Sequence, residues 1–334
     1  MGDTALKKMA KRINDTLKSD EFLSIVADNE TAGAIKTWVS TGNYALNYAC
    51  SGSALHGGFP FGRVVEMFGD PSTGKSLLGY HLLAETQKMG GIAILLDTEG
   101  AYTRVFGAQI GIDNEKMLFG EPDTVEDVFR VVEEICQEND GTPTTIFWDS
   151  IAQTSTHHEM EADFGVSDMS KAKMIKAGFR RVGRRIGKSN VLFVGSNHII
   201  SNIGVLYGRK DTTPGGKGYA FASSLRLDLR KGKNIKGESG DAIGTEVVAK
   251  VDKSKIAIPY RSCTIEISWL RGVDPNSGLL DLLVSKGVVE RSGAWLSYGE
   301  GRKFRSSEFA EVLSENPALL EKLSDWGTRE EPVK

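Results

Sequence analysis

Short apolar runs alternate with helical patterns through the middle of the chain. The runs are six to eight residues long and mostly apolar, which is typical of strands buried on both faces of a sheet. Repeated strand–helix units predict an α/β fold, with a mainly parallel sheet that helices cover. The strands are expected at "RVVEMFG" (63–69), "IAILLD" (92–97), "TTIFWD" (144–149) and "NVLFVGSN" (190–197), and the helices over about 75–88, 102–110, 124–137 and 171–188.

The pattern changes toward both ends of the chain. Three later segments, 224–231, 245–253 and 263–270, alternate apolar and polar residues as half-exposed strands do, so we expect antiparallel strands that extend the sheet. Near the start, a helical pattern precedes a short extended stretch. These patterns predict three parts of the chain. They are a small N-terminal helix and strand segment over 1–37, a core over 38–272 and a small C-terminal α/β lobe over 273–334.

Composition places the chain among ordinary globular proteins. Hydrophobic residues make up 40% and charged residues 25% of its 334 residues. The sequence has neither an apolar run of membrane-spanning length nor the apolar region of a secretory signal, so we expect a cytoplasmic protein without a membrane partner. Cys50, Cys136 and Cys263 are widely separated and lack metal-ligand spacing, which favours reduced thiols.

Charge is unevenly distributed. A net charge of -3 argues against a nucleic-acid-binding protein, but residues 171–188 hold eight Lys or Arg and no acid. A solvated helix face is the usual interpretation of such a run and stays open here. Charge of a single sign favours binding to phosphate backbones instead. An apolar stripe of Ile175, Phe179, Val182 and Ile186 would pack inward, leaving Lys173, Lys176, Arg180, Arg181, Arg184 and Arg185 outside.

A glycine-rich turn separates the run at 63–69 from the helical pattern after it. It matches the spacing G-x-x-x-x-G-K-[ST], and strand, turn and helix in this order are the context that the motif requires. Inward-pointing backbone N–H groups and the helix N-terminus can hold an anion. Lys75 would reach the outer phosphates and Ser76 would bind Mg²⁺, which predicts an ATP site. The turn consists of Gly69, Asp70, Pro71, Ser72, Thr73, Gly74, Lys75 and Ser76.

Two carboxylates follow neighbouring strands of the predicted sheet. Asp149 ends the run at 144–149, and Glu99 stands just past the run at 92–97. An ATPase needs a second carboxylate near the metal and a group that orients the attacking water. We expect Asp149 to face Mg²⁺, Glu99 to act as the base and Asp97 to support Glu99. The alternative, that both merely cap the following helices, stays open.

Two turn-rich stretches flank the basic helix and the strand after it. The first covers about 157–169 and the second 199–216. Loops of this length are usually functional or disordered. The second carries apolar side chains among glycines, which suits insertion between bases and a close approach to a DNA backbone. A flexible lid without a role in DNA binding is the alternative.

Taken together, these motifs resemble the RecA family of homologous recombinases. The resemblance covers about residues 36–326 and includes "FGDPSTGKS", "LLDTEGAYT", "FWDSIA", "NIGVLYGRKDTTPGG", "DKSKIAIPY" and "KGVVERSGAWLSYGEGRK". It implies a RecA-type P-loop ATPase core and an ATP-loaded helical filament on single-stranded DNA that exchanges strands with a homologous duplex. It also implies that residues 1–37 serve oligomerisation, and that single-strand-binding and loading proteins are candidate partners.

The resemblance also assigns roles to single residues. Glu99 would orient the water, Asp149 would serve the metal, and Phe106 would stack on adenine. Phe221 falls at a subunit-contact position. Lys253 and Lys255 look like paired lysines that reach the neighbouring subunit's phosphates, although exposed lysines at the end of a surface strand are the simpler interpretation. The DNA contacts that it implies are Met169, Lys173, Lys176, Arg180, Ile203, Gly215 and Gly216.

Some features depart from the family pattern. His198 stands where bacterial members carry a glutamine that senses the γ-phosphate, which is similar to phage recombinases of the UvsX type. A bacterial cell or a phage-infected host is therefore the expected setting. Pro214 stiffens the second loop, and the first loop is acidic for a DNA contact. Two other function classes stay open, a hexameric RecA-fold helicase or ring ATPase and a non-catalytic, ATP-gated DNA-coating mediator.

Overall fold

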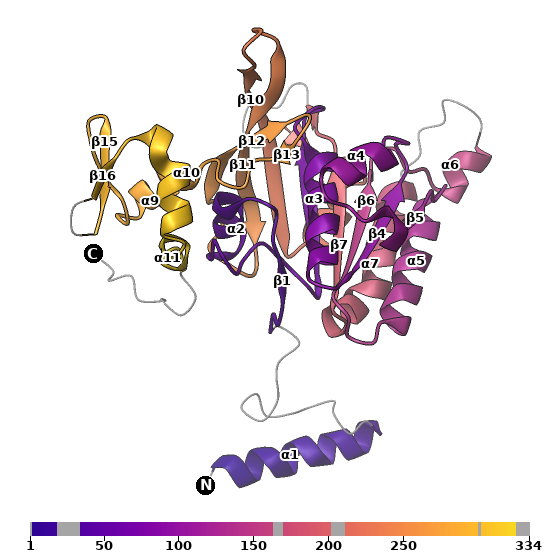
Figure 1. Cartoon of the computed structure of the whole chain (residues 1–334). Coiled ribbons are helices and arrows are strands. Elements are labelled where there is room, and N and C mark those ends of the chain that lie inside the picture. Colours follow the sequence, from indigo (N-terminus) through magenta and orange to yellow (C-terminus); the bar gives the residue numbers. More distant parts are fainter. Residues whose placement is uncertain (1, 19–33, 163–169, 202–210, 300–301, 325–334) are drawn as a thin grey trace. The chain divides into compact units, whose positions relative to one another are not determined.

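The computed structural model describes residues 2–18, 34–162, 170–201, 211–299 and 302–324 (Figure 1). Met169 and Ile203, two of the expected DNA contacts, lie outside these ranges. Contacts divide the chain into an N-terminal unit, Met1–Lys36, and a main unit, Thr37–Lys334. The N-terminal unit contains helix α1 (Gly2–Leu17), which exposes the apolar side chains of Leu6 and Met9.

A nine-stranded sheet forms the centre of the main unit, in the order β13-β12-β11-β10-β3-β7-β6-β4-β5. Pairing is parallel from β10 to β5 and antiparallel from β10 to β13. The expected α/β fold with an antiparallel extension is therefore confirmed. The strands are β3 (Arg63–Gly69), β4 (Ile92–Asp97), β5 (Met117–Gly120), β6 (Thr144–Asp149), β7 (Val191–Asn197), β10 (Leu225–Lys236), β11 (Ala242–Ser254), β12 (Ser262–Ser268) and β13 (Gly272–Val273).

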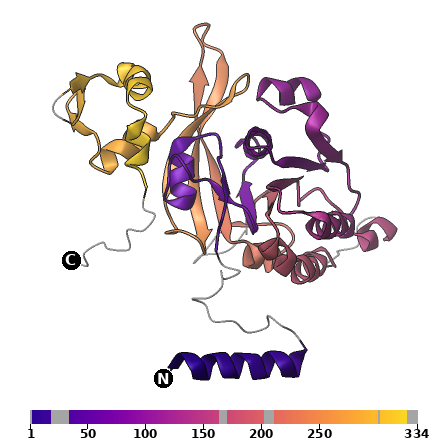
Figure 2. The same cartoon turned by 60° about the horizontal axis from the view of Figure 1, so that its bottom comes forward.

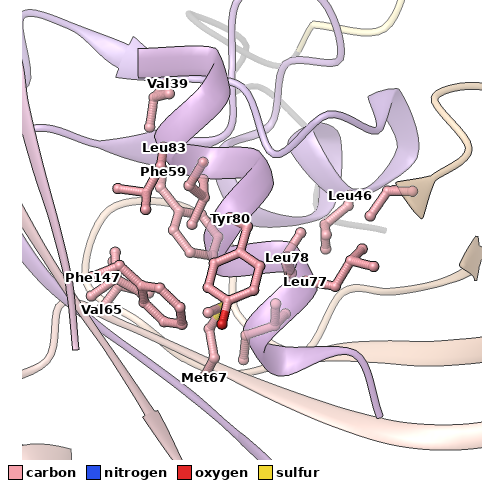
Figure 3. Close-up of a cluster of buried hydrophobic side chains, with 14 of the residues drawn as sticks. Val39, Leu46, Phe59, Val65, Met67, Leu77, Leu78, Tyr80, Leu83 and Phe147 are labelled. Carbon is pink, nitrogen blue, oxygen red and sulfur yellow. The ribbon is translucent and has the colours of Figure 1, made fainter. Parts of the chain in front are cut away.

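Helices cover both faces of this sheet. Alternate residues of one strand point to opposite faces, so Val65 and Val64 belong to different clusters of buried side chains. Val65 packs with Phe147 under helix α3 (Lys75–Lys88), as Figure 3 shows. Val64 packs with Trp148 under the helices of the other face. Those helices are α5 (Val125–Glu138), α7 (Ser170–Lys188) and α8 (Lys217–Ala222).

The end of the chain forms a small lobe beside helix α2 (Tyr44–Ser51), as Figure 2 shows. Tyr48 and Ala54 belong to the same buried cluster as Leu283 and Leu313 of the lobe. The Ala54 N–H donates to the Leu323 carbonyl at 3.0 Å, so α2 joins the lobe to the core. The lobe consists of α9 (Leu279–Ser285), β14 (Glu290–Ser292), β15 (Trp295–Tyr298), β16 (Arg302–Phe304), α10 (Phe309–Glu315) and α11 (Ala318–Glu321).

Short elements occupy several connections. The stretch expected as the first loop begins with helix α6 (His157–Glu161), because Thr156 and Glu159 form a capping box that satisfies its first N–H groups. The sequence pattern did not reveal α6, since it is short and has no apolar stripe. The other short elements are β1 (Trp38–Val39) with β2 (Phe59–Pro60), α4 (Arg104–Gln109) and β8 (Ile200–Ser201) with β9 (Asp211–Thr212).

Within the ranges that the structure describes, no helix combines the length and the apolar character that crossing a membrane requires.

Candidate functional site

The glycine-rich turn lies between β3 and α3 at the carboxyl edge of the parallel strands, where ligands bind in open α/β sheets. Gly74 adopts φ +78° at the start of α3, a backbone conformation that favours glycine. Gly69 passes so close to β10 that a Cβ atom would lie 2.1 Å from the Leu229 carbonyl oxygen. Backbone conformation at Gly74 and close packing at Gly69 therefore favour glycine at these two positions of the turn.

Lys75 is the cation of the turn. Its Nζ donates to the carbonyl oxygens of Gly69 at 3.1 Å and Asp70 at 2.7 Å, so the side chain curls over the turn. Burial lowers the pKa of Lys75, and the carboxylates of Asp149, Glu99 and Asp70 oppose this change. The Lys75 ammonium group is thus partly desolvated, and a bound phosphate would neutralise its charge.

Asp149 ends β6 and is buried, with only 1% of its surface exposed. The Ser196 hydroxyl donates to its Oδ1 at 2.5 Å, while Oδ2 has no hydrogen-bond partner in the described part of the chain. Burial raises the pKa of Asp149, and the nearby Ser196 and Ser76 hydroxyls act in the opposite direction. A buried carboxylate oxygen without a partner, close to a serine hydroxyl, fits the oxygen ligands that Mg²⁺ prefers.

Asp97 and Glu99 follow β4 and have different partners. Asp97 accepts four backbone N–H groups, from Glu99 and Gly100 at Oδ1 and from Ala101 and Tyr102 at Oδ2. This arrangement fixes the turn that carries Glu99 and confirms the expected support.

The Glu99 carboxylate itself faces other polar side chains. Its Oε1 accepts from the Ser150 hydroxyl at 2.5 Å and lies 3.3 Å from Nε2 of His198. The N-caps of the following helices are Thr103 for α4 and Thr156 for α6, so neither Glu99 nor Asp149 serves as a cap there. The alternative of simple helix capping is therefore wrong for both carboxylates.

One cavity of about 430 Å³ brings these groups together. Phe106 lines it from α4, with its ring centroid 6.3 Å from that of Tyr80. Six lining residues were missed by sequence reasoning, because no local motif marks them. They are Leu77 and Tyr80 of α3, Ala101 after β4, Thr245 of β11, Ile267 of β12 and Trp269 just after β12. The expected residues in the lining are Pro71, Ser72, Thr73, Gly74, Lys75, Ser76, Glu99, Phe106, Asp149 and His198, whereas Gly69 and Asp70 of the turn are not part of the described lining.

Comparison with known proteins decides the family. A model of the RecA N-terminal domain matches residues 4–274. The chain belongs to the RecA family. It is 37% identical to Protein RecA of Thermus aquaticus over 288 residues, which are 85% of this chain and 83% of that one. It is 32% identical to Protein RecA of Paracoccus denitrificans over 323 residues, 96% of this chain and 88% of that one. These matches confirm the resemblance and do not favour a ring helicase or a non-catalytic mediator.

The basic helix of this RecA-family chain is α7, and its apolar stripe is buried as predicted. Its outer face is less uniform than the sequence indicated. Arg181 and Arg185 both form ion pairs with Glu133 of α5, a carboxylate with only 4% of its surface exposed. Part of the positive charge of this exposed face is therefore paired with the buried Glu133. Lys173, Lys176 and Arg180 are exposed.

Gly215 and Gly216 lie where the second loop enters α8. Both have positive φ, +77° and +67°, and Gly216 is the N-cap of α8. A Cβ atom on Gly215 would meet the Ile175 side chain at 2.5 Å, and one on Gly216 would meet Ala172 at 3.0 Å. In this structure the two glycines allow a tight turn against α7. This packing explains glycine at both positions without any contact to DNA.

Lys253 and Lys255 stand at the end of β11, close to Phe221. Lys253 Nζ donates to the carbonyl oxygen of Ala220 at 2.6 Å, and both lysines donate to that of Phe221, at 3.3 and 3.2 Å. The expectation that the two point to one side is confirmed by this shared acceptor. Burial lowers the pKa of Lys253 to about 8, and Lys255 and Arg226 act in the same direction. Phe221 leaves 70% of its surface exposed.

A buried polar network joins this region to the end of β7, directly before His198. Glu66 of β3 accepts from Arg226 at 2.6 Å and from Asn197 at 3.1 Å, and Asn197 also donates to the Pro214 carbonyl at 3.1 Å. Arg226 also donates to Asp252 at 2.8 Å. The network therefore links the end of β7 to the second loop and to β11. Sequence reasoning missed it, because its members come from five segments of the chain.

Proposed function

We propose that this RecA-family chain is a DNA-dependent ATPase whose filament on single-stranded DNA carries out homologous pairing and strand exchange. The observation that carries the proposal is the single cavity in which Lys75, Asp149 and Glu99 meet. These three groups are what phosphoryl transfer to water requires: a cation for the phosphates, a carboxylate for the metal and a group that orients water.

Within the cavity, the position of each residue and the resemblance to the RecA family together support one role for each. Ser76 and Asp149 would hold Mg²⁺, whose charge would stabilise the phosphates, and Phe106 would stack on adenine. Glu99 would orient the attacking water. His198 lies 3.3 Å from Glu99, so it can contact both Glu99 and the outer phosphate, and it would report the state of the nucleotide to the second loop.

The DNA and subunit surfaces belong to the same proposal. Lys173, Lys176 and Arg180 on α7 would bind the DNA backbone, with Met169, Ile203, Gly215 and Gly216 in or beside the loops over 157–169 and 199–216. Residues 1–37 and Phe221 would contact the neighbouring subunit, and residues 273–334 would form the C-terminal lobe. Single-strand-binding and loading proteins are the expected partners, in the cytoplasm of a bacterium or an infected host.

A strand-exchange assay tests the proposal. The purified chain, a single-stranded DNA circle and a homologous linear duplex should give joint molecules when ATP and Mg²⁺ are present. The Lys75→Ala variant should give none and should lack DNA-stimulated ATP hydrolysis, because Lys75 is the cation of the phosphate turn. Joint molecules without ATP, or normal turnover in the variant, would contradict the proposed site.

A further inference from the structure

Tyr80 is a cavity residue to which the phosphate-binding motif gives no role. It follows Ser76 by four positions in α3, so the two side chains lie on one face of the helix. Helical side chains lean toward the N-terminus, which aims the Tyr80 ring at the turn that begins with Lys75 and Ser76. Tyr80 lines the nucleotide cavity, although only 2% of its surface is exposed.

The Tyr80 ring is held firmly among other aromatic rings. It packs edge-on against Tyr102 at 5.2 Å, Phe147 at 6.0 Å and Phe106 at 6.3 Å between ring centroids. Figure 3 shows the ring within the apolar cluster under α3, with its phenolic oxygen at one end. These ring contacts therefore fix the position of the Tyr80 hydroxyl group.

The Tyr80 hydroxyl is buried without a hydrogen-bond partner in the part of the chain that the structure describes. Such a group costs free energy unless a ligand or water satisfies it. The neighbouring Tyr102 differs, because its hydroxyl donates to Asn114 Oδ1 at 2.7 Å. Asp149 Oδ2 is a second unpartnered buried oxygen, and Asp149 lines the same cavity as Tyr80.

Electrostatics also place the Tyr80 hydroxyl beside the carboxylates. Burial raises its pKa far above the ordinary value for tyrosine, and the nearby charges of Asp149, Asp97 and Glu99 raise it further. The hydroxyl therefore stays protonated and neutral at physiological pH. A neutral hydroxyl can accept a hydrogen bond from a metal-bound water without adding another negative charge.

We propose that the Tyr80 hydroxyl accepts a hydrogen bond from a water molecule bound to Mg²⁺, the ion that the Asp149 carboxylate would hold. Mg²⁺ usually keeps several of its waters in protein sites, and each such water needs acceptors. The unpartnered Tyr80 hydroxyl in the cavity lining can supply one of them. Tyr80 thus acts as a positioning residue for the Mg²⁺–nucleotide complex, an inference that rests on the proposed ATP site.

The Tyr80→Phe variant isolates this role, because it removes only the hydroxyl. Binding of a fluorescent ADP analogue to the full-length protein should be about 3- to 10-fold weaker than wild type with Mg²⁺, the effect of one lost hydrogen bond. With EDTA in place of Mg²⁺, the two proteins should bind the analogue equally. The Tm without nucleotide should be unchanged or higher, since the variant buries no unpartnered hydroxyl.

Tyr102→Phe is the matched control. It removes a partnered hydroxyl outside the cavity lining, so it should lower Tm and leave the Mg²⁺ dependence of binding unchanged. Equal binding by Tyr80→Phe and wild type with Mg²⁺ would overturn the inference, and so would a loss of the same size with EDTA. If wild type itself fails to bind the analogue with Mg²⁺, the proposed ATP site is wrong, and the inference fails with it.

Discussion

At the scale of single residues, the surroundings decide what each carboxylate can do. Asp97 and Glu99 are two positions apart, but Asp97 is saturated by four backbone N–H groups and serves the backbone. Glu99 keeps a side chain that lines the cavity and, within the described ranges, meets the Ser150 hydroxyl and His198. Only Glu99 is therefore placed to act on a water molecule.

The Glu99→Gln variant should separate binding from chemistry. The amide keeps the shape of the side chain and can still accept from Ser150, so ADP affinity should stay within about 3-fold of wild type. It cannot take or polarise a proton, so DNA-stimulated ATP turnover should fall by about 10²-fold or more. Steady-state hydrolysis and equilibrium ADP binding measure the two quantities. A loss of ADP binding would instead assign Glu99 a structural role.

At the scale of one element, α7 combines two kinds of arginine. Arg181 and Arg185 pair with the buried Glu133 of α5, so they hold two helices together. Arg180 is exposed and belongs to the proposed DNA surface. Neighbouring positions on one helix point in different directions, since each residue turns by about 100°.

Arg180→Ala and Arg181→Ala form a matched pair that tests this division. Arg180→Ala should weaken binding to single-stranded DNA, because a phosphate contact is lost. The slope of the logarithm of the binding constant against the logarithm of the salt concentration should become less steep by about 0.7. Arg181→Ala should keep the slope and lower Tm, because the buried Glu133 loses one of its two partners. A salt titration and a thermal melt distinguish the two. An unchanged slope in Arg180→Ala would make α7 an ordinary solvated helix face.

At the scale of the whole molecule, some groups proposed for ATP hydrolysis lie apart from the chain's own cavity. Lys253 and Lys255 are absent from the described lining of the cavity and instead meet the Phe221 carbonyl. Phe221 exposes a large apolar side chain at this place. Two cations beside an exposed aromatic residue suit a subunit contact, which supports the proposal that they complete the neighbour's site.

Mixed filaments test that proposal. Lys253→Ala alone should keep ADP binding and lose DNA-stimulated turnover, because a cation supplied by the neighbour is worth about 10³-fold or more in rate. A mixture of Lys253→Ala and Glu99→Gln subunits should regain part of the hydrolysis, since some interfaces then pair an intact Glu99 with an intact Lys253. If electron microscopy shows co-assembly but the mixture hydrolyses ATP no faster than the separate variants, the lysines do not act across the interface.

Local signals in the sequence determined the core strands, the helix after the turn and the phosphate-binding motif. Periodicity reveals buried strands and helices because backbone geometry repeats over a few residues. The phosphate-binding turn was also recognisable from the sequence, because its local backbone conformation requires particular residues. Gly74, for example, adopts a left-handed conformation that favours glycine. Glu99 and Asp149 could be found because each follows a strand of the same parallel sheet.

Tertiary structure alone decided which distant groups meet. Glu133 and Arg181 are almost fifty positions apart, and only the packing of α5 on α7 shows that one neutralises the other. Trp269 reaches the cavity through the order of strands in the sheet, and the Tyr80 hydroxyl is known to lack a partner only once its surroundings are in place. Such contacts depend on register and packing between segments, for which a local pattern carries no signal.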